Sequence, residues 1–179
     1  KVNPEEGPST RSHDEKHIAF LRHSRANQTD TLLVANTDGS NEETVATRKW
    51  PERFAWNWAT SPAWTSDDQS LALPIINSDA RFDQASRDFG TVSGFFVTIF
   101  EIRLADRTQK LIQLSPQRFE QPNQVSILSD SSAIILSARA QGASFEQIWY
   151  LGRDGSARTV TNDLSDYRNV FLTADSKSL

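Results

Sequence analysis

Apolar and polar residues alternate along much of this chain, and the alternation predicts strands. A period of two is clear in "TLLVANT" (residues 31–37), "IFEIRLA" (99–105) and "IWYLGR" (148–153). Successive side chains of a strand point to opposite faces, and these segments are rich in β-branched and aromatic residues. Shorter apolar runs, "SLALPII" and "AIILSA", predict the strands that follow the acidic turns. No segment has a convincing helical period, so we expect an all-β fold.

Two phrases recur along the chain and define a repeat. The first is an acidic turn followed by an apolar run, and it occurs at Asp14, Asp67, Asp130 and Asp175. The second is an alternating strand that ends in an acidic turn, at Asp38, Asp106 and Asp154. The two phrases are 24 residues apart in the first and third repeats and 39 apart in the second. We assign the excess of 15 residues to the polar stretch "NSDARFDQASRDFG".

Each repeat predicts four strands joined as an antiparallel meander. Asp-Gly pairs at 38–39 and 154–155 predict two-residue hairpins, because glycine accepts the positive φ that such turns need. Repeats of about 40 to 50 residues with four strands are typical of β-propeller blades. We therefore predict a partial β-propeller over 13–179. Its blades span about 13–48, 60–115 and 123–161, after an N-terminal extension at 1–12, and a further blade starts at 167–179.

The phrase "SPAWTSDDQSLALP" (61–74) resembles the blade phrase of TolB-type, WD-repeat-like bacterial propellers, and the resemblance covers nearly the whole chain. Propellers typically close with four to eight blades, each of which buries its faces against two neighbours. The resemblance therefore implies that further blades, or a partner chain, cover the apolar faces at the two ends of the arc. The glycine of the family's turn is replaced by Asp68, Ser131 and Ser176. Because serine tolerates left-handed backbone poorly, we expect looser turns or turns of another type.

Composition and charge exclude several partners. The chain has 179 residues, of which 37% are hydrophobic and 23% charged, as in soluble globular domains. Its formal charge of -4 favours neither nucleic acid nor an acidic membrane surface. The longest apolar run, "FFVTIF" (95–100), is too short to span a bilayer. With no cysteine, neither a disulfide framework nor a thiolate metal site can form.

The loops at the end opposite the acidic turns are our candidates for a binding surface. They are long and rich in tryptophan, phenylalanine and arginine, which dominate binding hot spots. The candidate residues are Trp50, Trp56, Trp58, Arg81, Phe82, Arg87, Phe89, Arg118, Phe119 and Tyr167. The alternative is structural: Trp56, Trp58 and Trp64 flank the inner strand of a blade, where aromatic side chains fill the wedge between blades.

Catalytic and metal motifs are missing from the sequence. "HDEKH" (13–17) has two histidines at zinc-ligand spacing, but its glutamate is at the third position and the segment reads as a turn. There is no G-x-S-x-G nucleophile elbow and no phosphate-binding loop. Acidic pairs such as Asp163 with Asp166 lack the order of a calcium loop and fit turn hydrogen bonding. We expect no catalysis, metal or cofactor within these residues.

Two functional hypotheses remain open, together with a variant of the first. The first is a non-catalytic propeller that binds a protein or peptide, as the sensing or docking part of a larger bacterial signalling or envelope protein. The second is the propeller of a prolyl-oligopeptidase-like peptidase whose hydrolase domain lies outside this chain. The variant is a periplasmic accessory protein similar to TolB. A periplasmic or extracellular location fits the lack of cysteine, without excluding the cytoplasm.

Overall fold

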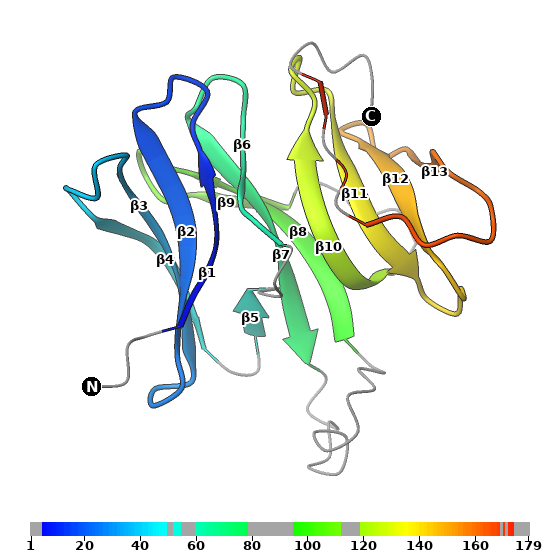
Figure 1. Cartoon of the computed structure of the whole chain (residues 1–179), viewed down its shortest axis with the longest axis horizontal. Coiled ribbons are helices and arrows are strands. Elements are labelled where there is room, and N and C mark those ends of the chain that lie inside the picture. The colour runs from blue at the N-terminus through cyan, green and yellow to red at the C-terminus, as the bar shows by residue number, and fades with distance from the viewer. Residues whose placement is uncertain are drawn as a thin grey trace.

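The computed structural model describes residues 5–49, 52–54, 60–78, 95–111, 119–168, 170 and 172–173. Over these residues the chain is all-β and contains no helix, as the sequence predicts. The strands form three antiparallel sheets, which we call sheets A, B and C in chain order (Figure 1). Their succession as separate sheets along the chain makes the molecule a partial, open β-propeller.

Sheets A and C are simple four-stranded meanders. Sheet A contains β1 (Glu5–Arg11), β2 (His17–Ser24), β3 (Thr29–Asn36) and β4 (Glu43–Lys49), in that order. Sheet C contains β10 (Phe119–Ile127), β11 (Ala133–Ala140), β12 (Glu146–Gly152) and β13 (Ala157–Thr159), also in chain order. Each strand is therefore hydrogen-bonded to the strand next to it in the sequence.

Sheet B has the same plan, but its first strand is in two pieces. The short strands β5 (Glu52–Phe54) and β6 (Ala63–Trp64) both pair with β7 (Ser70–Ser78). The sheet continues through β8 (Phe95–Arg103) to β9 (Gln109–Leu111). Sheet B lies between sheets A and C (Figure 1). Strand β6 contacts both β1 and β10, so the first strands of the three sheets meet along one side of the arc.

Alternation along the strands gives the molecule two cores, one on each face of sheet B. In β7, Leu71, Leu73 and Ile75 belong to the core shared with sheet A. Ala72 points the other way and belongs to the core shared with sheet C. Residues of opposite parity in a strand lie on opposite faces, and both faces of this strand are covered. This explains why β7 is apolar at every position from Leu71 to Ile76.

The two outer faces of the arc are also largely covered. On sheet A, Phe20, Leu33 and Ala35 are buried, and the guanidinium of Arg22 lies 5.4 Å from the centroid of the Phe20 ring. On sheet C, Ile135 and Ile148 pack with Val170 and Tyr167 from the segment after β13. The sequence predicts two open apolar faces. The described apolar side chains that cluster there are buried or partly buried. Further covering by another blade or partner stays a prediction.

The acidic turns share one geometry in all three sheets, which corrects the expectation of looser turns. The N–H of Glu15, Asp68 and Ser131 donates to the carbonyl three residues earlier, at 3.0, 2.9 and 2.7 Å. These three residues have φ of 60°, 54° and 57°, in the left-handed region that glycine occupies most easily. The turns thus keep the form that glycine would favour and carry other residues in it.

The Asp-Gly turns hold three residues between their paired ends, and not two as the sequence predicts. Asn36 N donates to Ser40 O, and Gly152 N donates to Ser156 O. Gly39 and Gly155 stand last in these loops, with φ of 83° and 88°. A three-residue hairpin loop ends in this way, with a left-handed residue that forms a bulge. The glycine is required as predicted, but at the last loop position.

Two boundaries also differ from the sequence-based ones. Residues 5–11 form β1 and pair with β2, although the prediction places 1–12 in an extension. Gly7, Pro8 and a register shift between Glu6 and Ser9 hide the alternating pattern there. The β7–β8 hairpin of sheet B is 14 residues longer than the corresponding hairpins of sheets A and C. The fifteenth extra residue lies in the turn from Arg103 to Thr108.

Candidate functional site: a groove between sheets A and B

A groove of about 720 Å³ runs between sheets A and B at the end that carries the acidic turns. Sheet A contributes one wall through the end of β3 and the turn into β4. Sheet B contributes the other wall through its acidic turn and the β8–β9 turn. The lining residues are His17, Val34, Ala35, Asn36, Asn41, Glu42, Glu43, Asp68, Gln69, Leu104, Ala105 and Arg107.

Two apolar side chains that line the groove join it to the core. Val34 and Leu104 are partly buried and pack against the core shared by sheets A and B. Val34 lies on β3 with the parity of the buried Leu32, so its side chain faces sheet B. Leu104 follows β8, and its N–H donates to Gln69 O at 2.9 Å, which fixes the position of the β8–β9 turn. The groove therefore continues the core outwards and opens between the two sheets.

Carboxylates stand around the mouth of the groove. Glu43 lies on β4 and its Oε2 is 3.0 Å from Nη2 of Arg107, which comes from sheet B. Glu42 is held from the other side by Arg22, at 2.6 and 2.8 Å, and this bidentate hydrogen bond lowers the pKa of Glu42. The side chain of Glu43 is 70% exposed and that of Glu42 is 41% exposed, so Glu43 is the more accessible carboxylate.

Asp68 lines the groove and ties the two sheets together. Its carboxylate accepts hydrogen bonds from the N–H groups of His13 and Asp14, at 2.9 and 3.0 Å, and lies 2.8 Å from His13 Nδ1. Burial raises the pKa of Asp68, but these hydrogen bonds outweigh it, so the pKa falls below its ordinary value. The acidic turn of sheet B is thereby anchored on the acidic turn of sheet A.

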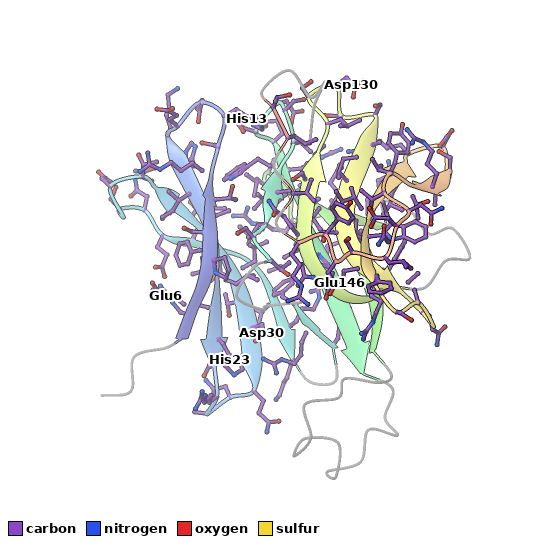
Figure 2. All side chains as sticks on the ribbon, turned by 45° about the vertical axis from the view of Figure 1, so that its right-hand side comes forward. Glu6, His13, His23, Asp30, Asp130 and Glu146 are labelled. Carbon is purple, nitrogen blue, oxygen red and sulfur yellow. The ribbon has the colours of Figure 1, made fainter. Side chains whose placement is uncertain are left out.

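A buried ionic cluster fixes the same two sheets at the opposite end. Asp30 of β3 is 1% exposed and lies 2.6 Å from Nδ1 of His23, its cross-strand neighbour on β2. Arg53 of β5 donates to both carboxylate oxygens of Asp30, at 2.9 Å each. Figure 2 shows His23 and Asp30 at the end of sheet A away from His13. The groove therefore lies between sheets that are held together at both ends.

Most of the sequence-predicted binding residues lie outside the described part of the chain. These are Trp50, Trp56, Trp58, Arg81, Phe82, Arg87, Phe89 and Arg118. Phe119 is 2% exposed and meets the ring of Trp149 edge-on, with centroids 5.1 Å apart. Tyr167 donates its hydroxyl to Asp163 Oδ2 at 2.6 Å and packs against the outer face of sheet C. A binding role for these residues stays a prediction.

The groove residues were not among the sequence-predicted candidates. Glu43 belongs to the first repeat and Leu104 and Arg107 to the second, so they meet only when the sheets stack. In the sequence, the acidic pair at 42–43 is typical of a polar turn, and Leu104 is predicted to end a strand. When the repeats are aligned at Asp106 and Asp154, Ala105 stands opposite Arg153, so the sequence does not mark Leu104. Only the backbone hydrogen bonds of the structure place Leu104 where the third repeat has Arg153.

The described residues contain neither a metal-binding cluster nor a membrane-spanning helix. Within these ranges no three His, Asp or Glu side chains gather in a way that could hold a metal ion. Nor does this part of the chain include a helix that is long and apolar enough to cross a membrane.

Solved structures similar to this chain include β-propeller domains of peptidases and of oligogalacturonate lyase. An oligogalacturonate lyase in complex with manganese matches with a TM-score of 0.60 at 14% identity, over 93% of this chain and 39% of that one. An oligogalacturonate lyase from Vibrio parahaemolyticus gives 0.57 at 13%, over 86% and 39%. The acylaminoacyl peptidase of Pyrococcus horikoshii gives 0.53 at 20%, over 88% and 25%.

These similarities establish the fold. The identities are low, and the chain spans less than two fifths of each of these structures. No protein-family model matches the sequence, and a comparison with curated proteins finds no significant match.

Proposed function

We propose that this chain is a non-catalytic β-propeller module that binds a protein or peptide, as the docking part of a larger bacterial signalling or envelope protein. The observation that supports this proposal is the groove between sheets A and B, which combines apolar walls with a charged mouth. Sites of this kind orient a ligand through a few polar groups and bind it through apolar contact.

The frame around the groove suits binding without rearrangement. Hydrogen bonds and ion pairs join sheets A and B at Asp68 and at the buried Asp30, and Trp64 Nε1 donates to Thr10 O at 3.3 Å between them. A rigid frame loses little conformational entropy when a ligand binds, so more of the contact energy contributes to affinity.

Selection from a random peptide-display library tests the proposal. The folded chain should enrich peptides that bind it with micromolar affinity in fluorescence polarisation, and the heat-unfolded chain should not bind them. A library that yields no peptide binding the folded chain above the unfolded control contradicts a peptide-binding function.

The loop end opposite the acidic turns is a second region to test with the selected ligands. Trp50→Ala, or deletion of residues 78–90, should weaken capture of ligands that use this end and leave the circular dichroism spectrum unchanged. If both variants bind every ligand of the parent normally, that end takes no part in binding.

A second proposal is that the chain is the propeller of a prolyl-oligopeptidase-like peptidase. What supports it is the likeness in fold to the Pyrococcus horikoshii acylaminoacyl peptidase and to the Porphyromonas gingivalis dipeptidyl peptidase 4. The gene's reading frame beyond residue 179 decides between the proposals. A hydrolase domain with a G-x-S-x-G segment there supports the peptidase, and a signalling domain next to the propeller supports the docking module.

A further inference from the structure

The repeat allows the two junctions between sheets to be compared position by position. In each sheet, one N–H after the third strand donates to a carbonyl in the acidic turn. The pairs are Thr37 to Lys16, Leu104 to Gln69 and Arg153 to Ser132, at 2.9, 2.9 and 3.1 Å. Leu104 and Arg153 therefore occupy the same place in sheets B and C. By the same alignment, Val34 of sheet A corresponds to Glu101 of sheet B.

At the junction of sheets B and C, an arginine side chain occupies this place. Nη2 of Arg153 lies 2.6 Å from Oε2 of Glu101 on the neighbouring sheet. Nε of Arg153 donates to the carbonyl of Ser131, the left-handed residue of the acidic turn. Both side chains are mostly buried, at 28% and 19% exposure. The space between two sheets at this position thus accepts a guanidinium with its alkyl stem.

At the junction of sheets A and B, the corresponding residues are Leu104 and Val34. Both are shorter than the arginine and glutamate, and both are apolar. The groove of about 720 Å³ lies here, lined by these two side chains. Three carboxylates line it (Glu42, Glu43 and Asp68) against one guanidinium, Arg107. Apolar walls with an acidic mouth are complementary to a side chain that has an alkyl stem and a cationic head.

Arg107 already demonstrates this complementarity at the mouth. It comes from sheet B, and its Nη2 lies 3.0 Å from Glu43 Oε2 on sheet A, while its Nη1 donates to Leu104 O. Its backbone is left-handed, with φ of 61°, where the equivalent residues Gly39 and Gly155 are glycines. Glu43 therefore binds a guanidinium at the mouth of the groove. The arginine that carries it occupies a left-handed position that glycine would adopt at no conformational cost.

We propose that the groove between sheets A and B binds a lysine or arginine side chain of a peptide partner. The stem lies between Val34 and Leu104, and the cationic head binds Glu43 in place of Arg107. This inference rests on the proposed peptide-binding function and adds to it the site and the class of side chain that is recognised. The Arg107 ion pair competes with the ligand, so Arg107 limits affinity, whereas Glu43 provides it.

The probe is the capped pentapeptide Ac-Ala-Ala-Arg-Ala-Ala-NH₂, with a citrulline peptide of the same length as the uncharged control. Titration of the ¹⁵N-labelled chain, followed by NMR, should shift the amide signals of Val34, Leu104 and Gln69 with the arginine peptide. The citrulline peptide should shift them far less. Raising the salt from 50 mM to 500 mM should weaken binding, because the mouth is exposed and screening acts on it.

Two substitutions at the mouth should change affinity in opposite directions. Glu43→Gln removes the accessible carboxylate and should weaken binding about two- to five-fold, as expected for an exposed charge pair. Arg107→Gly removes the competing guanidinium, keeps the left-handed turn, and should strengthen binding by a similar factor. Glu6→Gln is the matched control: it neutralises an exposed carboxylate of the same sheet, paired with Arg22 at 3.2 Å outside the groove.

The outcomes separate the inference from the proposed function. If the arginine peptide causes no shifts at the groove while display-selected peptides bind elsewhere, the cation site is wrong and the docking function stands. If Glu43→Gln and Arg107→Gly both weaken binding, the mouth recognises something other than a cation, and the inference is again overturned. If neither the arginine peptide nor any selected peptide binds, the docking function itself is contradicted.

Discussion

Four residues other than glycine occupy left-handed turn positions that recur from sheet to sheet. Glu15, Asp68 and Ser131 share one position of the acidic turn, and Arg107 shares the position of Gly39 and Gly155. For an L-residue this conformation costs about 1 to 2 kcal/mol, because Cβ approaches the following carbonyl oxygen. Asp68 and Ser131 gain contacts to the neighbouring sheet in return, through His13 and Ser66.

Glu15 tests this cost most cleanly, because it belongs to the first sheet of the arc and its side chain is exposed. Glu15→Gly should raise the free energy of unfolding by up to about 1 kcal/mol relative to Glu15→Ala, since only glycine relieves the strain. Urea denaturation of the two variants measures the difference. A glycine variant that is less stable than the alanine variant contradicts the assigned turn geometry.

The aspartates of the turns accept hydrogen bonds from the chain two residues further on. Asp14, Asp38, Asp130 and Asp154 each accept the N–H of residue i+2, at 2.9 to 3.0 Å. Hydroxyl donors add to this, and the pKa of each carboxyl is lowered. Because the charged form is the one that accepts, these turns favour ionised aspartate.

Asp14 gives a pH-dependent prediction. Hydrogen bonds from the Ser12 hydroxyl and the Lys16 N–H lower its pKa from 3.8 to about 2. The stability contributed by ionised Asp14 is therefore complete above about pH 4 and is lost as the pH falls towards 2. Ser12→Ala should raise the pKa of Asp14 towards 3.8, as followed by the carboxyl ¹³C shift in an NMR titration. An unchanged midpoint contradicts the role of the hydroxyl.

At the scale of elements, each junction between sheets is built from a core and a few polar ties. Sheets A and B share the larger cluster of buried apolar residues and are tied by Asp30 with Arg53 and by Asp68. Sheets B and C are tied by Arg153 with Glu101 and by Thr60, whose hydroxyl donates to the carbonyls of Pro122 and Asn123. The polar ties fix the register of one sheet on the next.

The buried tie at Asp30 should matter far more than an exposed one. Asp30→Asn removes the charge that both Arg53 and His23 face, and should lower the free energy of unfolding by about 2 kcal/mol, the magnitude of a hydrogen bond to a charged group. Glu6→Gln removes a carboxylate whose side chain is 61% exposed, and should change the free energy of unfolding by less than about 0.5 kcal/mol. Equal effects of the two substitutions in chemical denaturation contradict the assigned roles.

The sequence predicts strands well where apolar and polar residues alternate without interruption. It fails where a bulge breaks the alternation, and where a site depends on a side chain from another repeat. Residues 31–36 and 148–152 lie in strands as predicted. Strand β1 escapes prediction because Gly7 and Pro8 interrupt its pattern, and the inner strand of sheet B is split into β5 and β6. The groove could not be predicted, because Glu43 and Arg107 meet only through the stacking of two sheets.

At the scale of the whole molecule, the chain is an arc of three sheets with their first strands on the inner side. Sheet B lies between sheets A and C, so the two outer sheets are not neighbours (Figure 1). The arc explains why the apolar residues of β7 face two different cores, and why the two junctions can be compared as equivalent sites. The groove thus lies at the junction where Leu104 and Val34 take the places of Arg153 and Glu101.

The contacts between the inner strands test this arrangement most directly. In an NMR spectrum that records through-space proton contacts, the indole N–H of Trp64 should give signals to Thr10, and Thr60 should give signals to Pro122 and Asn123. Sheet A would then be linked to sheet B, and sheet B to sheet C. Strong contacts between the strands of sheets A and C, with those at Trp64 and Thr60 missing, would mean a closed sandwich and contradict the propeller arc.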